Sequence, residues 1–301
     1  PMGVPSDGDP DGVIVPDGLR SDPLPTDDGD VELSVPPGRS GALALLRSFL
    51  DGAVDWYPEH RDDAAADATS RLSAALHFGC LHPSEILINL DRTRPGHEAF
   101  ARQIAWRDFY AQVLADRPDS AWGDYRPDAT VHVDTGPGTD AAFTAWCEGR
   151  TGFPFVDAGM RQLLAEGWMH NRLRMVTASF LVKDLHLDWR RGARHFLRHL
   201  VDGDIANNNH GWQWVAGTGT DASPYHRIFN PTAQGKRFDP GGEYIRRWVP
   251  ELADVGSDEI HEPEGTLGAG AAGYPSPMVD HAAERQEALR RLEVTKQERS
   301  T

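Results

Sequence analysis

Residues 202–231 read DGDIANNNHGWQWVAGTGTDASPYHRIFNP. The stretch combines two aspartates around a glycine, three consecutive asparagines, two tryptophans around a glutamine, a glycine-rich turn, and an arginine in an aromatic setting. Polar groups at this density need hydrogen-bond partners if they are buried. A large polar aromatic ligand would supply those partners. A surface loop with two tryptophans tucked beneath it explains the composition equally well.

Three further motifs accompany this stretch: TSRLS at 69–73, WRDFY at 106–110 and GWMHNRLRM at 167–175. Together the four segments resemble the FAD-binding catalytic domain of the DNA photolyase and cryptochrome family, over residues 41–255 and in the family's order. The class I cyclobutane pyrimidine dimer photolyases are the most similar subgroup. The resemblance implies a mainly α, multi-helical fold in which light-excited reduced FAD donates an electron to a flipped-out dimer in UV-damaged DNA.

Bulk composition is compatible with this expectation. The 301 residues are 39% hydrophobic and include nine tryptophans, enough for a sizeable core. No apolar run approaches the roughly 18 residues of a membrane span, and no signal peptide opens the chain, so we expect a cytoplasmic protein without membrane contact. Two cysteines and scattered histidines predict a reducing compartment and no metal site. We also expect a monomer.

The formal charge of −16 argues against phosphate binding if the chain is taken as a whole. The arginines, however, are concentrated in and around the motifs. Three of the 30 basic residues are lysines, and this bias suggests a salt-adapted or GC-rich source, in which molar salt would screen repulsion over ~3 Å.

The pattern predicts three segments. Residues 1–39 are acidic and rich in Pro and Gly, which is typical of a linker or disordered arm. Residues 40–255 are expected to be helical and, by resemblance, to be the FAD- and DNA-binding catalytic domain, and 256–301 are expected to form a C-terminal tail with a short, frayed helix. The family places an α/β antenna domain before the linker; we expect that domain, with its antenna chromophore, to be missing from this chain.

The TSRLS motif is expected to open a helix. Hydroxyl side chains there cap free backbone N–H groups, and the same groups attract an anion such as a pyrophosphate. Capping alone is the commoner use, and only the resemblance favours the cofactor. By resemblance, the cofactor-binding residues are Tyr57, Thr69, Ser70, Arg71, Leu72, Ser73, Arg174, Asp202, Gly203, Asp204 and Asn208. Asn208 would face the flavin nitrogen that gains a proton on reduction.

Residues 98–116 are the clearest helix by period. Gln103, Arg107 and Tyr110 share one stripe with Trp106 beside it, a set that could stack on a base and hydrogen-bond its edge. A helix flank with ordinary polar groups is the alternative. Dimer photolyases usually carry glutamate where this chain has Gln103, whereas (6-4) photolyases are expected to carry glutamine.

Residues 151–175 supply a second wall of the expected pocket. By resemblance, Asn171, Arg172 and Met175 touch the lesion and its phosphates, while Arg174 pairs with Asp202. The His170-Asn171-Arg172 run favours dimer photolyases. Further residues implied to face the DNA are Trp214, Arg227 and Gln234. The residues implied in catalysis are Gln103, Trp106, Asn171, Met175 and Asn208.

Trp212 and Trp189 match the first two members of the family's electron-transfer relay. Unrelated core tryptophans are far commoner, and only their register with the 202–209 segment supports the relay. Residues 117–150 are expected to be loop-rich. The surface tryptophan that usually ends the relay is missing, because Thr135-Gly136 occupies its place. Trp122 or Tyr125 could substitute, and the sequence does not place either near the relay.

Two other functions stay open at this point. A cryptochrome-type photoreceptor would bind FAD and signal to a partner without repairing DNA. A helical nucleic-acid-binding module would carry no cofactor.

Overall fold

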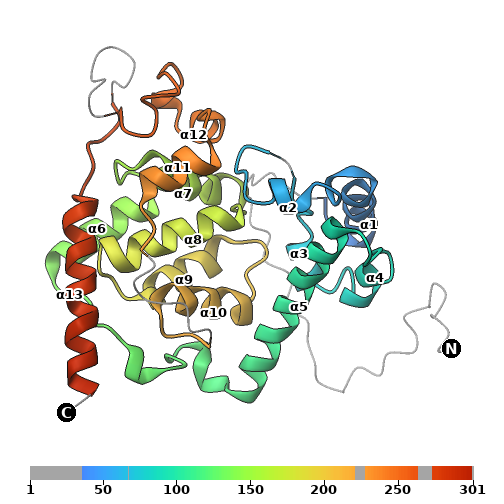
Figure 1. The fold of residues 1–301 in the computed structure, drawn as a ribbon, viewed down its shortest axis with the longest axis horizontal. Helices are drawn as coiled ribbons and strands as arrows, with labels where there is room; N and C mark the ends of the chain where they lie inside the picture. The colour runs from blue at the N-terminus through green and yellow to red at the C-terminus, as the bar shows by residue number, and fades with distance from the viewer. Residues whose placement is uncertain (1–35, 67, 221–227, 264–272, 300–301) are drawn as a thin grey trace, which may run out of the picture. The chain divides into compact units, whose positions relative to one another are not determined.

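The computed structural model describes residues 36–66, 68–220, 228–263 and 273–299, and this part of the chain is helical without any strand (Figure 1). The predicted mainly α fold is confirmed. The earlier elements are α1 (Gly38–Ser48), η2 (Phe49–Ala53), α2 (Tyr57–His60), α3 (Ser73–His77), α4 (Pro83–Leu87), α5 (Pro95–Asp116), η3 (Pro118–Ala121), η4 (Pro127–Ala129) and α6 (Pro137–Cys147). The later elements are α7 (Pro154–Glu166), α8 (Asn171–Ser179), η5 (Phe180–Asp184), α9 (Trp189–His199), α10 (Ile205–Ala216), α11 (Pro231–Phe238), α12 (Glu243–Trp248), η6 (Pro250–Leu252) and α13 (His281–Arg299).

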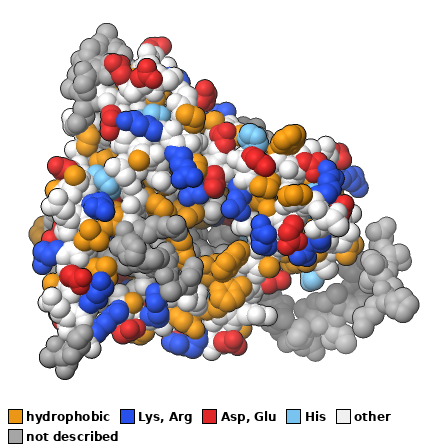
Figure 2. All heavy atoms as spheres, in the orientation of Figure 1, with side chains coloured by type: hydrophobic (Ala, Val, Ile, Leu, Met, Phe, Trp, Pro, Cys, Tyr) orange, Lys and Arg blue, Asp and Glu red, His pale blue; other side chains and the backbone are white. Residues whose placement is uncertain are grey.

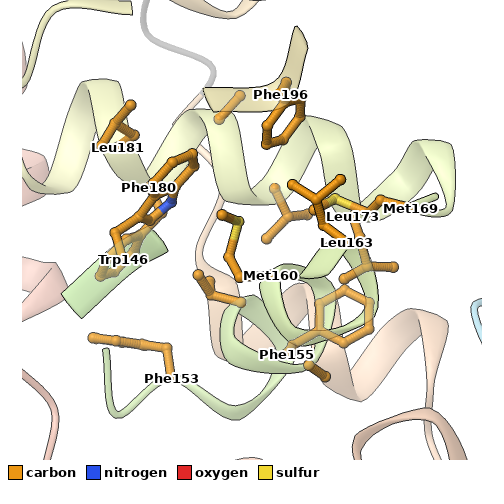
Figure 3. Packing of buried hydrophobic residues seen from close by; sticks show 14 of the residues in the cluster. Trp146, Phe153, Phe155, Met160, Leu163, Met169, Leu173, Phe180, Leu181 and Phe196 are labelled. Carbon is orange, nitrogen blue, oxygen red and sulfur yellow. The ribbon is translucent and has the colours of Figure 1, made fainter. Parts of the chain in front are cut away.

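Two hydrophobic clusters hold these helices. The smaller core joins α1, α2, α3, α4 and the first half of α5, and at its centre Phe49, Tyr57 and Phe100 pack ring against ring. The larger core joins α6 to α12, and Figure 3 shows Trp146 beside Phe180 and Met160 within it. The long helix α5 links the two, because its first half enters the smaller core while its second half contacts α10.

Helix ends follow local chemistry. Pro95 begins α5, where a missing backbone N–H costs nothing. Gly167 ends α7 at φ 61° and Gly217 ends α10 at φ 84°, in the left-handed region that glycine favours. Gly167 therefore separates α7 from the segment that leads to α8.

Gly192 of α9 leaves space for the Trp212 side chain of α10. A Cβ atom there would overlap the Trp212 indole and lie 2.6 Å from Leu181 Cδ2. Only glycine leaves room for the Trp212 ring against the backbone of α9, in the first turn of the helix that Trp189 begins.

Three expectations about the elements were wrong. The stretch expected to be loop-rich contains α6, whose Trp146 is fully buried and donates a hydrogen bond to the Thr177 carbonyl. The helix expected from Thr69 begins at Ser73. The C-terminal helix is packed rather than frayed, because His281 at its start lies 2.5 Å from the buried Asp184 carboxylate.

Tyr274 also ties the C-terminal region to the larger core. Its hydroxyl donates a 2.5 Å hydrogen bond to Asp157, a buried carboxylate that also accepts from Thr151 and Gly152. By their contacts, all described residues fall in one compact unit.

Candidate functional site

The amino end of α10 presents the polar residues of the 202–209 segment. Asp204 caps the helix, and its Oδ1 accepts 2.7 Å hydrogen bonds from both the backbone and the side chain of Asn207. Asn208 donates to the Ala193 carbonyl of α9 at 3.1 Å and to Asn209 Oδ1 at 2.8 Å. The asparagine run is thereby ordered by its own neighbours, and Asn208 is oriented against α9.

Arg174 and Asp202 form the pair that the resemblance implied. Arg174 Nη2 lies 2.8 Å and 3.1 Å from the two carboxylate oxygens, and its Nε donates to the Met169 carbonyl. The Asp202 side chain is 2% exposed. A carboxylate this buried needs such a partner, because an unpaired buried charge is costly.

The TSRLS motif lies next to this segment. Ser70 Oγ accepts from the backbone N–H of Leu72, while the cap position of α3 falls on Leu72 itself and receives no side-chain hydrogen bond. The expectation that the motif's hydroxyls cap the helix is therefore wrong, because the chain turns before the helix begins. His77 at the end of α3 brings its Nδ1 to 3.9 Å from Asp204 Oδ2, which joins the motif's helix to the start of α10.

Arg71 makes a second link between the two cores. It adopts φ 50°, unusual for a residue with a Cβ, and its guanidinium lies 4.4 Å from the Trp168 ring centroid. Trp168 follows Gly167 directly, so this contact holds TSRLS against the segment that leads to α8.

Tyr57 belongs to the smaller core. Its ring packs edge-on to Phe49 and Phe100, Arg61 lies 6.0 Å from its centroid, and burial raises the pKa of its hydroxyl. These contacts describe a packing residue, and its role towards a cofactor stays a prediction.

The second half of α5 carries an exposed aromatic cluster. Trp106 and Phe109 are 47% and 40% exposed, and Tyr110 contacts both rings. Tyr110 also stacks on His210 of α10, with centroids 5.6 Å apart and planes 3° from parallel. In Figure 2, orange hydrophobic side chains lie side by side near the middle of the visible face, with blue basic groups spread around them. Flat aromatic surface of this kind suits stacking on unpaired bases.

Two residues predicted on the α5 stripe have differing surroundings. Arg107 donates from Nη2 to the Leu76 carbonyl of α3 at 3.2 Å, so its guanidinium points toward α3. Gln103 is half-buried, one turn before Arg107. Gln103, Arg107 and Tyr110 therefore lie on one helix as expected, and the Arg107 guanidinium is hydrogen-bonded to the protein itself.

The start of α8 places the other predicted wall. The Asn171 amide lies 3.8 Å from Met175 Sδ, so these two predicted residues are adjacent. Arg172 pairs with Asp62 at 2.8 Å and lies 4.2 Å from the Phe238 ring centroid. Arg172 was expected to reach DNA phosphates; in the structure its guanidinium is held by Asp62 instead.

The remaining predicted DNA-facing residues are more scattered. Gln234 lies in α11, and its Oε1 is buried without a hydrogen-bond partner among the described residues. Trp214 packs against the larger core at the end of α10. Arg227 lies outside the described residues.

The two predicted relay tryptophans meet at α9. Trp212 packs between Phe196 and Trp146, with centroids 5.0 Å and 6.0 Å away. Trp189 begins α9 and donates its indole N–H to Asp124 Oδ1 at 2.7 Å. Gly192, against which the Trp212 ring lies, is three residues from Trp189, about 4.5 Å along the helix axis.

The donor set suits a flavin dinucleotide. Asp204, Asn207 and Asn208 offer both acceptors and amide donors, as the edge of an isoalloxazine ring requires, and hydroxyls and an arginine of TSRLS suit phosphate. His77 at the end of α3 joins the TSRLS side to Asp204, and Arg71 joins TSRLS to Trp168. Within the described ranges, no cluster of three or more His, Cys, Asp or Glu residues could hold a metal, and no helix is long and apolar enough to cross a membrane.

Sequence reasoning missed three residues that order this site: Asp62, His77 and Asp124. Asp62 holds Arg172, His77 approaches Asp204, and Asp124 accepts from Trp189. Each acts on a partner more than 60 residues away in the chain, so no local pattern could have identified it.

Comparisons with known proteins agree with this geometry. Residues 100–294 match a family described as the FAD binding domain of DNA photolyase. The deoxyribodipyrimidine photo-lyase of Streptomyces griseus is 54% identical over 91% of this chain, and that of Escherichia coli K12 is 45% identical over 87%. This chain spans 60% and 57% of those two relatives.

Solved structures show the same likeness. A bacterial class III photolyase from Agrobacterium tumefaciens superposes with a TM-score of 0.81 and 40% identity, over 88% of this chain and 57% of its own. A cryptochrome from Synechocystis superposes with a TM-score of 0.77 and 31% identity, over 86% and 56%. Since the family match covers well over half of the chain, the chain belongs to the family of FAD-binding domains of DNA photolyases.

Proposed function

We propose that this chain binds FAD between TSRLS and the start of α10, and that it repairs cyclobutane pyrimidine dimers in UV-damaged DNA under light. When bound, the reduced flavin would supply the excited electron that splits the dimer and would receive it back. The protein's part is to bind, orient and tune.

The cofactor would be held from two sides. Arg174 fixes Asp202, and Asp204 orders Asn207, so the carboxylates and amides at this helix end keep their positions. Asn208, oriented by its bonds to Ala193 and Asn209, would accept or donate at the ring nitrogen that titrates on reduction. The hydroxyls and Arg71 of TSRLS would take the phosphates.

The DNA would meet the aromatic cluster of α5. Trp106, with Tyr110 fixed by its stack on His210, would form one wall for a flipped base, and the Asn171–Met175 pair would form another. Gln103 can donate and accept hydrogen bonds at the lesion, although it offers no carboxylate. The antenna chromophore expected for this family would belong to another domain, and we expect the working protein to be a monomer.

One observation carries this proposal: Arg174 pairs with the buried Asp202, directly beside the Asp204 cap of α10. The Asp204 carboxylate in turn lies 3.9 Å from His77 Nδ1, at the end of the helix that follows TSRLS. The test begins with bound flavin. Asp202→Asn should lose most of the flavin that wild-type protein releases on denaturation, whereas Asp254→Asn, at an exposed position of the same charge, should keep it. Colourless wild-type protein would favour the cofactor-free nucleic-acid module.

Substrate choice needs a second assay. Chemically reduced protein is illuminated with blue light on two oligonucleotides, one carrying a cyclobutane thymine dimer and one a (6-4) product. We expect turnover of the first. Turnover of the second alone would mean that Gln103 outweighs the His170-Asn171-Arg172 run, and turnover of neither by flavin-loaded protein would favour a photoreceptor.

A further inference from the structure

Three tryptophans lie around the first turns of α9: Trp212 against Gly192, Trp189 at the start of the helix, and Trp122 beside Arg194. Trp212 is 2% exposed, Trp189 is 4% exposed and Trp122 is 37% exposed. Trp212 rests on Gly192 in the first turn of the helix that Trp189 begins. The first two are therefore neighbours through one turn of backbone.

The segment that carries Trp122 is bound directly to Trp189. Asp124 accepts the Trp189 indole N–H at 2.7 Å. The Arg190 guanidinium lies 4.8 Å from the Trp189 ring centroid, and its Nε donates to the Trp122 carbonyl at 2.6 Å. One turn further along α9, Arg194 lies 5.0 Å from the Trp122 ring centroid. The Arg190 side chain thus reaches from the Trp189 ring to the backbone carbonyl of Trp122.

Solvation gives this series a direction. An indole that has lost an electron is a cation, and burying a cation in apolar surroundings is costly. The positive charge therefore moves from Trp212 toward the exposed Trp122, where water solvates it. At Trp189 the Asp124 carboxylate faces the indole N–H and pairs with Arg190 at 3.3 Å, so it offsets the charge that Arg190 brings to this ring. The charge of Arg194, an exposed residue, is screened by water.

The other aromatic candidates do not offer such an exit. Trp146 also contacts Trp212, but it is fully buried and donates its N–H to the Thr177 carbonyl. Tyr125 stacks with Arg117 at 5.1 Å, and its backbone N–H bonds to Gln213 rather than to α9.

We propose that Trp122 is the surface electron donor of this chain, which takes the place of the tryptophan absent at Gly136. The inference rests on the proposed function, because the electron acceptor is photo-excited, oxidised FAD. One electron passes from Trp212 to the flavin, one from Trp189 to Trp212 and one from Trp122 to Trp189. The oxidised Trp122 releases its indole proton to water, and an external thiol restores it with one electron and one proton.

The test compares Trp122→Phe with two matched variants, Tyr125→Phe and Trp56→Phe; Trp56 is 65% exposed and lies at the start of α2. Oxidised, flavin-loaded protein is illuminated with a thiol, and loss of the oxidised flavin absorption is timed. We expect at least a tenfold slower rate in Trp122→Phe and wild-type rates in the other two. A wild-type rate in Trp122→Phe, or a comparable loss in Tyr125→Phe, overturns the proposal.

Dimer repair by dithionite-reduced protein separates this inference from the proposed function. Trp122→Phe should repair as wild type does once its flavin is already reduced. If reduced wild-type protein repairs nothing, the repair function fails while the photoreduction rates still decide the role of Trp122.

A measurement on unaltered protein covers the case in which Trp122→Phe folds poorly. Wild-type protein is illuminated in air without thiol, and peptide mass spectrometry maps oxidised residues. We expect oxygen to be added at Trp122, and accumulation at Tyr125 or at Trp56 instead overturns the proposal. Protein that binds no flavin overturns it as well, since the electron then has no acceptor.

Discussion

At Gly192 the backbone of α9 supports the edge of an indole ring. A methyl group there would overlap Trp212 and crowd Leu181, both of which are buried and cannot move away cheaply. We expect Gly192→Ala to lower the free energy of unfolding by about 1–3 kcal/mol, as overpacking does. Urea unfolding measures this. Gly211→Ala in α10 is the control, because nothing lies within 4 Å of its added Cβ, and it should be neutral or stabilising by up to ~1 kcal/mol.

His170 ties stability to pH. Burial lowers the pKa of His170 to about 4, with Arg172 and Arg174 acting in the same direction and Asp62 against them. His170 therefore binds a proton more readily in the unfolded chain than in the folded one. Its contribution to the free energy of unfolding is fully present above about pH 6.5 and is lost as the pH falls toward 4. In His170→Asn, the loss of unfolding free energy between pH 6.5 and pH 4 should be smaller by on the order of 3 kcal/mol. The asparagine side chain can still accept the hydrogen bond from the Arg172 N–H that caps α8.

Unfolding curves between pH 4 and 8 check this prediction. The exposed His60→Asn should leave the profile unchanged. If the free energy of unfolding of His170→Asn fell with decreasing pH as steeply as that of the wild type, the prediction would be wrong.

At the residue scale, some motif residues were placed correctly, whereas the expected capping by TSRLS was wrong. The Arg174–Asp202 pair and the common helix of Gln103 and Trp106 were predicted. The ion pair of Asp62 with Arg172 was missed, because nothing local indicates a partner 110 positions away.

The helix α13 is packed against the rest of the protein, although its sequence suggested a loosely held terminal helix. Its charged composition predicted fraying, yet His281 meets the buried Asp184, and His186 meets Glu284 at 2.8 Å. Periodicity located the long helix α5 well because its apolar residues are regularly spaced. It missed α6 and the packing of α13, since those depend on what the rest of the chain places opposite them.

Two histidine pairs on α13 offer a matched comparison. Asp184 is fully buried, whereas the pair between His132 and Glu298 is exposed on both sides. His281→Ala should lower the free energy of unfolding by about 2–4 kcal/mol, because it leaves a buried carboxylate without its partner. His132→Ala should change it by less than about 0.5 kcal/mol. Equal effects in thermal unfolding at pH 7 would show that α13 is held by something other than this pair.

For the whole molecule, the excess of acidic residues opposes DNA binding in two ways: by net charge and by an ion pair with an arginine near the proposed DNA surface. Asp62 holds Arg172, and the net charge of −16 opposes approach of a polyanion. Asp62→Asn should free Arg172 for phosphate, raise affinity for dimer-containing DNA several-fold at low salt, and steepen the dependence of log affinity on log salt by about one.

Titration of labelled duplex at several salt concentrations measures both effects. The exposed Glu298→Gln removes the same charge from α13 and should change affinity only slightly. An unaltered salt slope in Asp62→Asn would show that Arg172 braces residues 61–66 and does not reach phosphate.

The contacts of α13 bear on how the molecule is made. Its partners at Asp134, Asp184 and His186 lie 97 to 157 positions earlier, so they leave the ribosome long before the helix that covers them. During synthesis Asp184 must wait, uncovered and exposed to chaperones and proteases, until His281 has emerged. A nascent chain stalled shortly before residue 281 would therefore be open to digestion at η5, and the finished protein would resist it.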